Sequence, residues 1–421
     1  MRGTILRADL HIHSRYSRAT SPRMDIPHLV SAARLKGVDL LGTGDFTHPG
    51  WMRELRSWLS RGESGDLYEY GGVLFLPQTE VNLQFRRGEK IHRIHVVVLA
   101  PSLEAAEQAS EVASRWGDLA VDGRPTLSVE PAEFVEAIAE VDPWIEVIPA
   151  HAWTPWYSVF GSRSGFDSLE EAFGDQVVRI HAIETGLSSD PPMNWRLSSL
   201  DRYSLVSFSD AHSPSPLRLG RELTAFEVRA PEYREIVRAI RGEGTSRIAY
   251  TVEVPPEYGK YHYDGHRDCG VRLHPKEATR RGNTCPVCGR PLTLGVLHRV
   301  EELADRPEGY RPPDKRPFYS LIPLEELLAM ANSRRALPDK PQVVYEALIR
   351  EFGSELEALM SGDLERLRSI AGDLVAQSVR VMREGSLRIE PGYDGVYGKI
   401  IPPGETSRDP PDFEDLTDYL S

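Results

Sequence analysis

The sequence predicts an α/β fold whose largely parallel sheet is open or closed into a barrel, followed by a small zinc-binding module and a helical region. Over the first two-thirds of the chain, short apolar runs alternate with amphipathic stretches, which is typical of strands alternating with helices. A turn-rich basic segment holding all three cysteines follows, and after it apolar residues recur at helical spacing. A chain of 421 residues is too long for one ordinary core, so we expect domains at 1–245, 246–320 and 321–400 and an acidic tail at 401–421.

The strands are predicted from short apolar runs that are rich in β-branched residues and bounded by turn residues. One run leads into His11, and the others cover 38–45, 73–80, 144–151, 177–186 and 203–210. Amphipathic helices are predicted at 25–37, 131–140 and 231–242. The first of them has Asp25 as its N-cap, Pro27 in its first turn and Gly37 at its end.

Residues able to bind metals stand where these apolar runs end. They are His11 and His13, Asp45, Glu80, His151, and Asp210 with His212. Because the carboxyl ends of parallel strands meet at one face of an α/β fold, we expect these side chains to converge there. Mixed imidazole and carboxylate ligands suit Zn, Mn or Fe, with Mg at an oxygen-rich position.

His95 opens an apolar run instead of ending one, so it reaches the same rim only if an antiparallel hairpin returns it. His92 is an alternative to His95, and His48 is a second alternative ligand. We expect His28 and His181 to be structural.

The cysteines predict a second metal site of a different kind. His266-x-x-Cys269 and Cys285-x-x-Cys288 have the same internal spacing, and each pair is followed by a turn glycine. This spacing is typical of tetrahedral structural zinc, a closed site that stabilises a segment with little core of its own.

Charge is segregated along the chain. The net charge of −13 should repel nucleic acid at long range, but residues 260–299 hold eight Lys or Arg against three acids. The aromatic residue Trp156, after His151, could stack on an extruded base or simply pack at the rim, and Arg163 and Arg218 could contact phosphate or only solvent.

Other function classes lack their motifs in this sequence. There is no G-x-S-x-G elbow, no phosphate-binding P-loop and no G-x-G-x-x-G. No apolar run approaches the roughly 20 residues needed to span a bilayer. The N-terminus has no signal-peptide pattern, and we therefore expect a cytoplasmic protein without a membrane partner.

The ordered motifs DLHIHS, GTGD, TE, PAH and SDAH resemble the polymerase and histidinol phosphatase (PHP) family of metal-dependent phosphoesterases. That family folds as a distorted (β/α)7 barrel. Longer phrases, among them AHAWTPW, ETGLSSD, SDAHSPSP and RVEELADRPEGYRPP, are similar to the endonuclease Q family within it, over nearly the whole chain. The resemblance implies a DNA repair endonuclease that cuts 5′ of deaminated bases (hypoxanthine, uracil, xanthine) or abasic sites.

The resemblance also implies a set of site residues. The metal ligands would be His11, His13, Asp45, Glu80, His95, His151, Asp210 and His212. Glu80 would bridge two cations, and Asp210, Glu80 and His212 would form the catalytic group. Ser17 stands where many PHP proteins have Asp or His, and Phe46 where they have His, so two divalent cations (Zn, Mn or Mg) are expected and a third is the alternative.

Two other functions stay open at this stage. One is a PHP-type phosphatase of a small phosphoester, and the other is a non-catalytic nucleic-acid-binding adaptor. A third question concerns partners: the terminal DFEDLTDYLS could dock on a sliding clamp, but it lacks the leading Gln of that motif, so a plain acidic tail is favoured.

Overall fold

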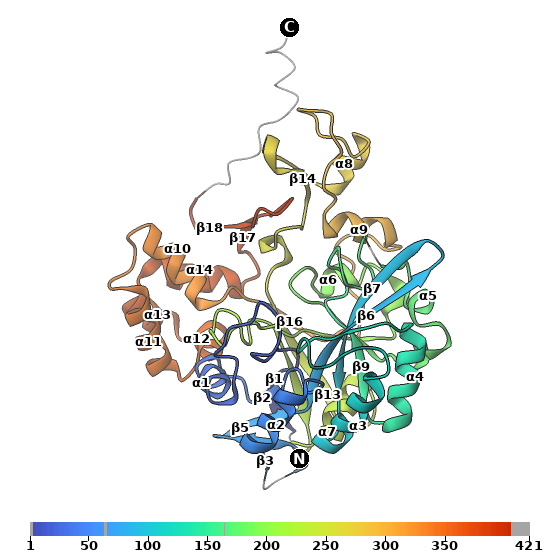
Figure 1. Ribbon diagram of the computed structural model, residues 1–421. Coiled ribbons are helices and arrows are strands. Elements are labelled where there is room, and N and C mark those ends of the chain that lie inside the picture. Colours follow the sequence, from blue (N-terminus) through green and yellow to red (C-terminus); the bar gives the residue numbers. More distant parts are fainter. Residues whose placement is uncertain (1–2, 63–64, 164, 406–421) are drawn as a thin grey trace.

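A computed structural model describes residues 3–62, 65–163 and 165–405. The N-terminal two-thirds form the main body, the zinc-binding segment projects from it, and the C-terminal helices lie against one side (Figure 1). Within the described residues, no helix is both long and apolar enough to cross a membrane. The predicted acidic tail lies outside the described residues except for 401–405.

Three sheets build the main body. The largest has the order β16-β13-β12-β1-β2-β5-β4-β3, a four-stranded sheet has the order β8-β6-β7-β9, and β10 pairs with β11. The bounds are β1 Thr4–Asp9, β2 Leu40–Gly42, β3 Ser60–Arg61, β4 Tyr68–Tyr70, β5 Val73–Leu76, β6 Gln78–Arg87, β7 Lys90–Leu99, β8 Thr126–Leu127, β9 Glu146–Pro149, β10 Ala182–Glu184, β11 Ser204–Val206, β12 Leu223–Val228, β13 Arg247–Glu253 and β16 Phe318–Ser320.

The pairing is mixed, and the prediction of a largely parallel sheet was wrong. β1 pairs parallel with β2 but antiparallel with β12, and β6 pairs antiparallel with β7. The physical reason is connection length, because only a short turn at Gly88 and Glu89 joins β6 to β7, whereas a parallel crossover needs about a dozen residues.

A shared core nevertheless closes the body as a distorted barrel. Leu6 of β1, Val97 of β7, Ala182 of β10 and Phe226 of β12 belong to one buried apolar cluster, so strands of all three sheets face the same interior. Helix α7 (Tyr233–Arg241) contributes five of its residues to this cluster. The helices α1 (Ile26–Lys36), α2 (Pro49–Trp58), α3 (Leu103–Ala113) and α4 (Pro131–Val141) pack outside.

Local sequence explains the helix ends. Asp25 caps α1 by accepting a hydrogen bond from the backbone N–H of His28, and Gly37 ends it with a φ of 91°. The strand predicted at 177–186 is shorter than expected, since Gly174–Arg179 forms a 3-10 turn and only Ala182–Glu184 is a strand. Val178 is 74% exposed there, so this position of the apolar run does not face a core as the predicted buried strand would require.

The main sheet extends past residue 245, where the sequence analysis ended the first domain. β13 pairs with β12, and β16 pairs with β13, so residues 247–253 and 318–320 continue the barrel. Ile248 and Val252 are buried in its cores, which is why the chain stays extended here.

The zinc-binding segment and the helical region follow. The former holds β14 (Asp264–His266), β15 (Val271–Leu273), α8 (Pro275–Arg280) and α9 (Val296–Leu303). The helices are α10 (Leu324–Ser333), α11 (Pro341–Phe352), α12 (Glu355–Met360), α13 (Leu364–Ala371) and α14 (Asp373–Arg383). A hairpin of β17 (Arg388–Glu390) and β18 (Lys399–Ile401) ends the described chain.

Candidate metal centre at the barrel mouth

The predicted ligands come from strand ends on one side of the barrel. His11 and His13 follow β1, Glu80 lies in β6, and His151 follows β9. Asp210 follows β11. His95 arrives on β7, where the antiparallel ladder pairs it with Asn82, two residues beyond Glu80 on the same face. The hairpin that the sequence analysis required for His95 is therefore present.

Two groups of possible ligand atoms form here and share Glu80. In each group all ligand atoms lie within 4.8 Å of one another. The first group consists of His11, His13, Glu80 and Asp210. The second group consists of Glu80, His95 and His151. His13 Nε2 is 3.1 Å from Asp210 Oδ1 and 3.2 Å from Glu80 Oε2. The other oxygen of Glu80 is 2.7 Å from His95 Nδ1 and 3.1 Å from His151 Nε2.

These residues fit divalent cations. His11 Nε2 is buried and has no hydrogen-bond partner among the described residues, although it points into the first group. A buried polar atom without a partner is costly, and a metal ion would satisfy it. A carboxylate that offers one oxygen to each of two groups is suited to bridge two cations.

Asp45 was predicted as a ligand, but both of its oxygens are occupied by the protein. Asp45 Oδ1 is 3.0 Å from His13 Nδ1, while Oδ2 accepts hydrogen bonds from the backbone and hydroxyl of Ser14 and from the hydroxyl of Ser17. A carboxylate on the outer nitrogen of an imidazole orients its inner nitrogen toward a metal. The structure thus gives Asp45 the place of a partner that orients His13.

His212 also lies beside the two groups without joining them. Its ring centroid is 4.4 Å from that of His13, and its Nδ1 lies 2.9 Å from the backbone oxygen of Asp210. Since a carbonyl only accepts, Nδ1 carries the proton and a neutral His212 ring has its lone pair on Nε2.

Two residues of the site were not predicted from the sequence. Glu184 ends β10 and its carboxylate lies 2.9 Å from His11 Nδ1, while it also accepts a hydrogen bond from the backbone N–H of His151. Glu184 followed the same strand-end pattern as the predicted ligands and could have been found. Arg124 donates to Glu80 Oε2 at 3.1 Å from a loop before β8, where neither periodicity nor a motif marks it.

Opposing charges set the protonation of the centre. Burial acts to lower the pKa of His11, but the carboxylates of Glu184 and Glu80 outweigh it and raise that pKa well above its ordinary value. Burial acts to raise the pKa of Glu80, but His95, Arg124 and His11 lower it well below its usual range. Glu80 therefore stays ionised, as metal binding requires of a carboxylate ligand.

The backbone at this centre is strained. Asp45, His151 and Asp210 have positive φ values of 43°, 31° and 48°, which L-residues other than glycine adopt only at a cost. Such strain persists where the surrounding structure fixes the residue. Here the strained backbone directs the three side chains toward the same site.

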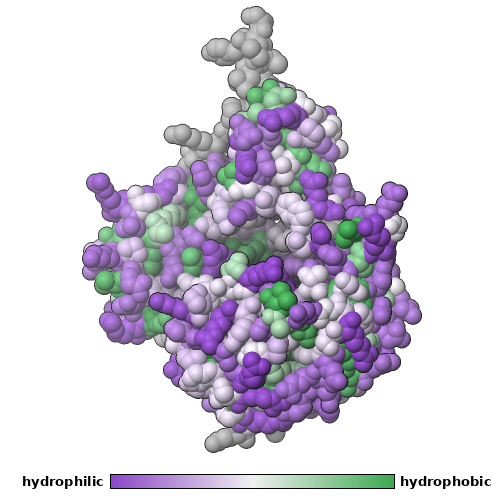
Figure 2. Space-filling view, in the orientation of Figure 1, coloured by the Kyte–Doolittle hydropathy of each residue, from purple (hydrophilic) through white to green (hydrophobic). Residues whose placement is uncertain are grey.

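A cavity of about 670 Å³ opens over the two groups. Its walls include His95, His151, Asp210 and Arg124 on the metal side and Trp156, Tyr261 and Tyr397 on the other. Figure 2 shows this face of the molecule hollowed between the main body and the zinc-binding segment above it.

The predicted substrate-binding residues are only partly brought together. Trp156 lines the cavity, is 47% exposed and meets the ring of Tyr261 edge-on at 5.8 Å. Arg218 lines a neighbouring cavity of about 420 Å³ that shares Leu187, Gly259 and Tyr397 with the first. Arg163 is exposed and lines neither cavity.

The other predicted histidines lie elsewhere. His92 stacks on Phe166 at 4.3 Å, and His48 caps α2. His28 lies 2.7 Å from Asp25, and His181 lies 2.7 Å from Glu146.

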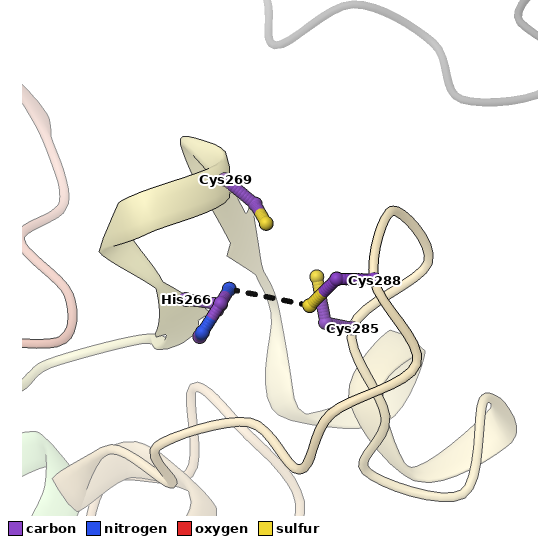
Figure 3. A group of neighbouring side chains, drawn as sticks. All are labelled: His266, Cys269, Cys285 and Cys288. Atoms are coloured by element: carbon purple, nitrogen blue, oxygen red, sulfur yellow. Dashed lines mark hydrogen bonds between the residues drawn. The ribbon is translucent and has the colours of Figure 1, made fainter.

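The four predicted zinc ligands converge in the projecting segment. His266 and Cys269 come from β14 and the turn after it, and Cys285 and Cys288 face them from the opposite loop (Figure 3). All four ligand atoms lie within 4.8 Å of one another, and Cys288 Sγ is 3.7 Å from His266 Nδ1. Two pairs of soft ligands around one point fit a closed tetrahedral zinc site.

Most of the basic residues beside this site are neutralised. Arg272 pairs with Glu390, Lys276 with Glu308, Arg281 with Glu277, Arg299 with Asp167 and Arg267 with Asp268. Lys260 lines the large cavity. Only a few of the basic side chains predicted to give this segment its positive charge are therefore not paired with a carboxylate.

Comparison with known proteins places this site in context. A family model described as the MJ0043 C-terminal domain matches residues 323–386. The crystal structure of the lesion-specific endonuclease PfuEndoQ from Pyrococcus furiosus is similar, with 34% identity, a TM-score of 0.85 and coverage of 99% of both chains. An endonuclease Q complex with a 27-mer duplex carrying an abasic lesion at the active site is also similar, at 34% identity and a TM-score of 0.83, covering 96% of this chain and 99% of that one.

A further relative matches in part. The uncharacterized protein MJ0043 of Methanocaldococcus jannaschii is 33% identical over 255 residues, which are 59% of this chain. The match spans only 31% of the length of that protein.

Proposed function

Because the chain belongs to the endonuclease Q family, we propose that it is a DNA repair endonuclease that hydrolyses the phosphodiester on the 5′ side of a damaged nucleotide. The proposed lesions are hypoxanthine, uracil, xanthine and abasic sites. The observation that carries the proposal is that two groups of candidate ligands share Glu80, beneath an open cavity lined by their members His95, His151 and Asp210. Two neighbouring cation sites are typical of metal-dependent phosphodiesterases.

The residues of the site would have different roles in the reaction. When bound, two divalent cations would supply an activated water near neutral pH and neutralise charge on the phosphate. Glu80 and Asp210 would hold the two positions at a fixed separation, while Asp45 and Glu184 orient His13 and His11. The lone pair on His212 Nε2 is available to accept a proton at the rim of the site.

Charge balance gives Arg124 a role. Asp45, Glu80, Glu184 and Asp210 contribute four negative charges, and Arg124 contributes one positive charge. With two divalent cations the site would carry one net positive charge, which a single phosphodiester neutralises. We therefore propose that Arg124 contacts a non-bridging oxygen of the scissile phosphate, where charge develops during the reaction.

The cavity walls would receive the damaged nucleotide. Trp156, Tyr261 and Tyr397 offer ring faces for stacking, and a lesion that weakens pairing lowers the cost of extruding its base. Arg218 in the neighbouring cavity would meet an adjoining phosphate.

A nicking assay tests the proposal. Labelled duplexes with hypoxanthine, uracil or an abasic site are incubated with the protein and Mn²⁺ or Mg²⁺, next to an undamaged duplex. We expect a single nick 5′ of the lesion and none in the undamaged duplex. Asp210→Asn should abolish the nick with nearly unchanged thermal unfolding, because it removes a ligand that is partly exposed.

The exposed Asp175→Asn provides a matched control that should cut like the wild type. Turnover of small phosphomonoesters without any nick would instead identify a phosphatase. A protein that retains only one zinc and cuts nothing would be an adaptor.

A further inference from the structure

Asp210 lies in a loop whose position is not set by its own contacts with the barrel alone. This loop, residues 209–220, joins β11 to β12 and will be called the Asp210 loop. Its two ends are held by Asp9, which accepts hydrogen bonds from Ser209 and from the backbone N–H of Gly220. The middle of the loop, around Pro216, is held by a different part of the molecule.

Lys36, the last residue of α1, makes that second attachment. Its Nζ donates a hydrogen bond to the backbone oxygen of Pro216 at 2.7 Å. Its aliphatic stem packs on Gly220, where a Cβ would lie 2.8 Å from Lys36 Cγ. The side chain is only 2% exposed, so its amino group depends on protein partners.

The partner of Lys36 belongs to the helical region. Lys36 Nζ lies 2.7 Å from Glu355 Oε1, and the Glu355 side chain is fully buried. Glu355 also accepts hydrogen bonds from the backbone N–H of Leu324 and from the hydroxyl of Tyr345. A continuous buried polar path therefore runs from α11 and α12 through Lys36 to the Asp210 loop.

Stability alone does not explain this path. Replacing a buried ion pair by apolar residues is often neutral or stabilising, because the attraction barely offsets the lost hydration of the two charges. What the pair does fix is geometry, since a desolvated ammonium group satisfied by one carboxylate and one carbonyl allows little displacement of either partner. Displacing Pro216 would release the loop that carries Asp210, whose φ of 48° already needs support from its surroundings.

We propose that Lys36 is a positioning residue for the barrel-mouth site, through which the helical region fixes the Asp210 loop. Among the described residues, none from 323 to 386 lines the metal-side cavity, so this region reaches the metal ligands themselves through contacts such as this one. The activity readout of the test rests on the proposed function, whereas the other two readouts do not.

The test compares three proteins with the wild type. Lys36→Met with Glu355→Gln removes the donor to Pro216 and the charge pair together, while Gln keeps an acceptor for Leu324 and Tyr345. Glu355→Gln alone leaves Lys36 free to bond Pro216. The control is Glu351→Gln, which breaks the exposed ion pair with Arg366 in the same helices.

Three quantities are measured on each purified protein: hydrogen exchange by mass spectrometry, metal retained after dialysis, and kcat and KM on a lesion duplex. In the double variant we expect faster exchange confined to residues 209–220, loss of barrel metal, and a kcat lower by about 10- to 100-fold with KM little changed, the range typical of residues that orient metal ligands. In all three quantities Glu355→Gln should lie between the double variant and the wild type, and the Glu351→Gln control should match the wild type.

Two outcomes would overturn the proposal. One is a double variant whose hydrogen exchange and retained metal both match those of the wild type. The other is a uniform rise in exchange over the whole chain with the metal retained, which would identify a purely structural ion pair. If the wild type cuts no lesion, the proposed function fails, and exchange and metal retention still decide the role of Lys36.

Discussion

Among the described residues, Arg124 is the one guanidinium within hydrogen-bond reach of Glu80, the candidate ligand that the two groups share. Its place makes a direct prediction for catalysis. Arg124→Met should reduce the nicking rate by about 10²- to 10³-fold, because a positioned donor to developing charge contributes that much. Single-turnover nicking of a lesion duplex measures the effect.

The control and a rescue experiment separate charge from folding. Arg115→Met changes an exposed arginine of the same connection and should leave the rate unchanged. Free guanidinium added to Arg124→Met should restore part of the rate. A variant that cuts at the wild-type rate would exclude contact between Arg124 and the phosphate.

At the scale of residues, the sequence indicates candidate metal ligands more readily than the residues that contact them. The strand-end pattern selected His11, His13, Glu80 and Asp210, whose ligand atoms the structure brings together, because metal chemistry restricts which residue types can serve. It could not separate Asp45 from them, since an orienting carboxylate and a ligating one are the same residue type. Arg124 was out of reach because its role depends on a loop path that no periodicity encodes.

The zinc-binding segment is an element whose stability depends on its metal. Its apolar cluster is small, with five buried residues that include Cys285 itself. Cys285→Ser should remove one zinc per chain and unfold this segment, because a structural zinc contributes about 10 kcal/mol or more to such modules. Metal analysis and hydrogen exchange over 262–296 measure the two effects.

The matched control lies between the two cysteines of the same turn. Val287 is 58% exposed, so Val287→Ala should keep the zinc and the slow exchange. Zinc loss in Val287→Ala, or none in Cys285→Ser, would contradict the assignment of the ligands.

Elements were predicted where local signals decide and missed where tertiary contacts decide. The helix at α1 was recovered because Asp25 and Gly37 cap it through local hydrogen bonds and dihedrals. The strand at 177–186 was too long, because exposure of Val178 depends on what packs there. β13 was assigned to the next module, since pairing with β12 cannot be read from residues 247–253 alone.

The whole molecule carries a net charge of −13, yet the proposed substrate is a polyanion. Five of the eight basic residues in 260–299 pair with carboxylates, which leaves Lys260, Arg280 and Arg290. Arg124 pairs with Glu80, but the proposed function places it on the scissile phosphate, so it is counted as a fourth phosphate contact. Four such contacts predict that lesion-duplex affinity falls about 100-fold between roughly 50 and 200 mM salt.

Fluorescence anisotropy with Ca²⁺ in place of the catalytic metal measures this affinity without cutting. A variant that changes Arg281, already paired with Glu277, should show the same salt slope as the wild type. An affinity independent of salt would mean that apolar contacts dominate DNA binding.

The residue pairing between β6 and β7 determines how the site would respond to an insertion in the turn that joins them. Ten consecutive residue pairs, from Gln78 with Leu99 to Arg87 with Lys90, align Glu80 and His95 on one face. Inserting a single residue at the Gly88 turn would shift that alignment by one and present Ile94 or Val96 to the ions instead of imidazole. The register of this hairpin, as much as the identity of its residues, therefore determines whether His95 reaches the site beside Glu80.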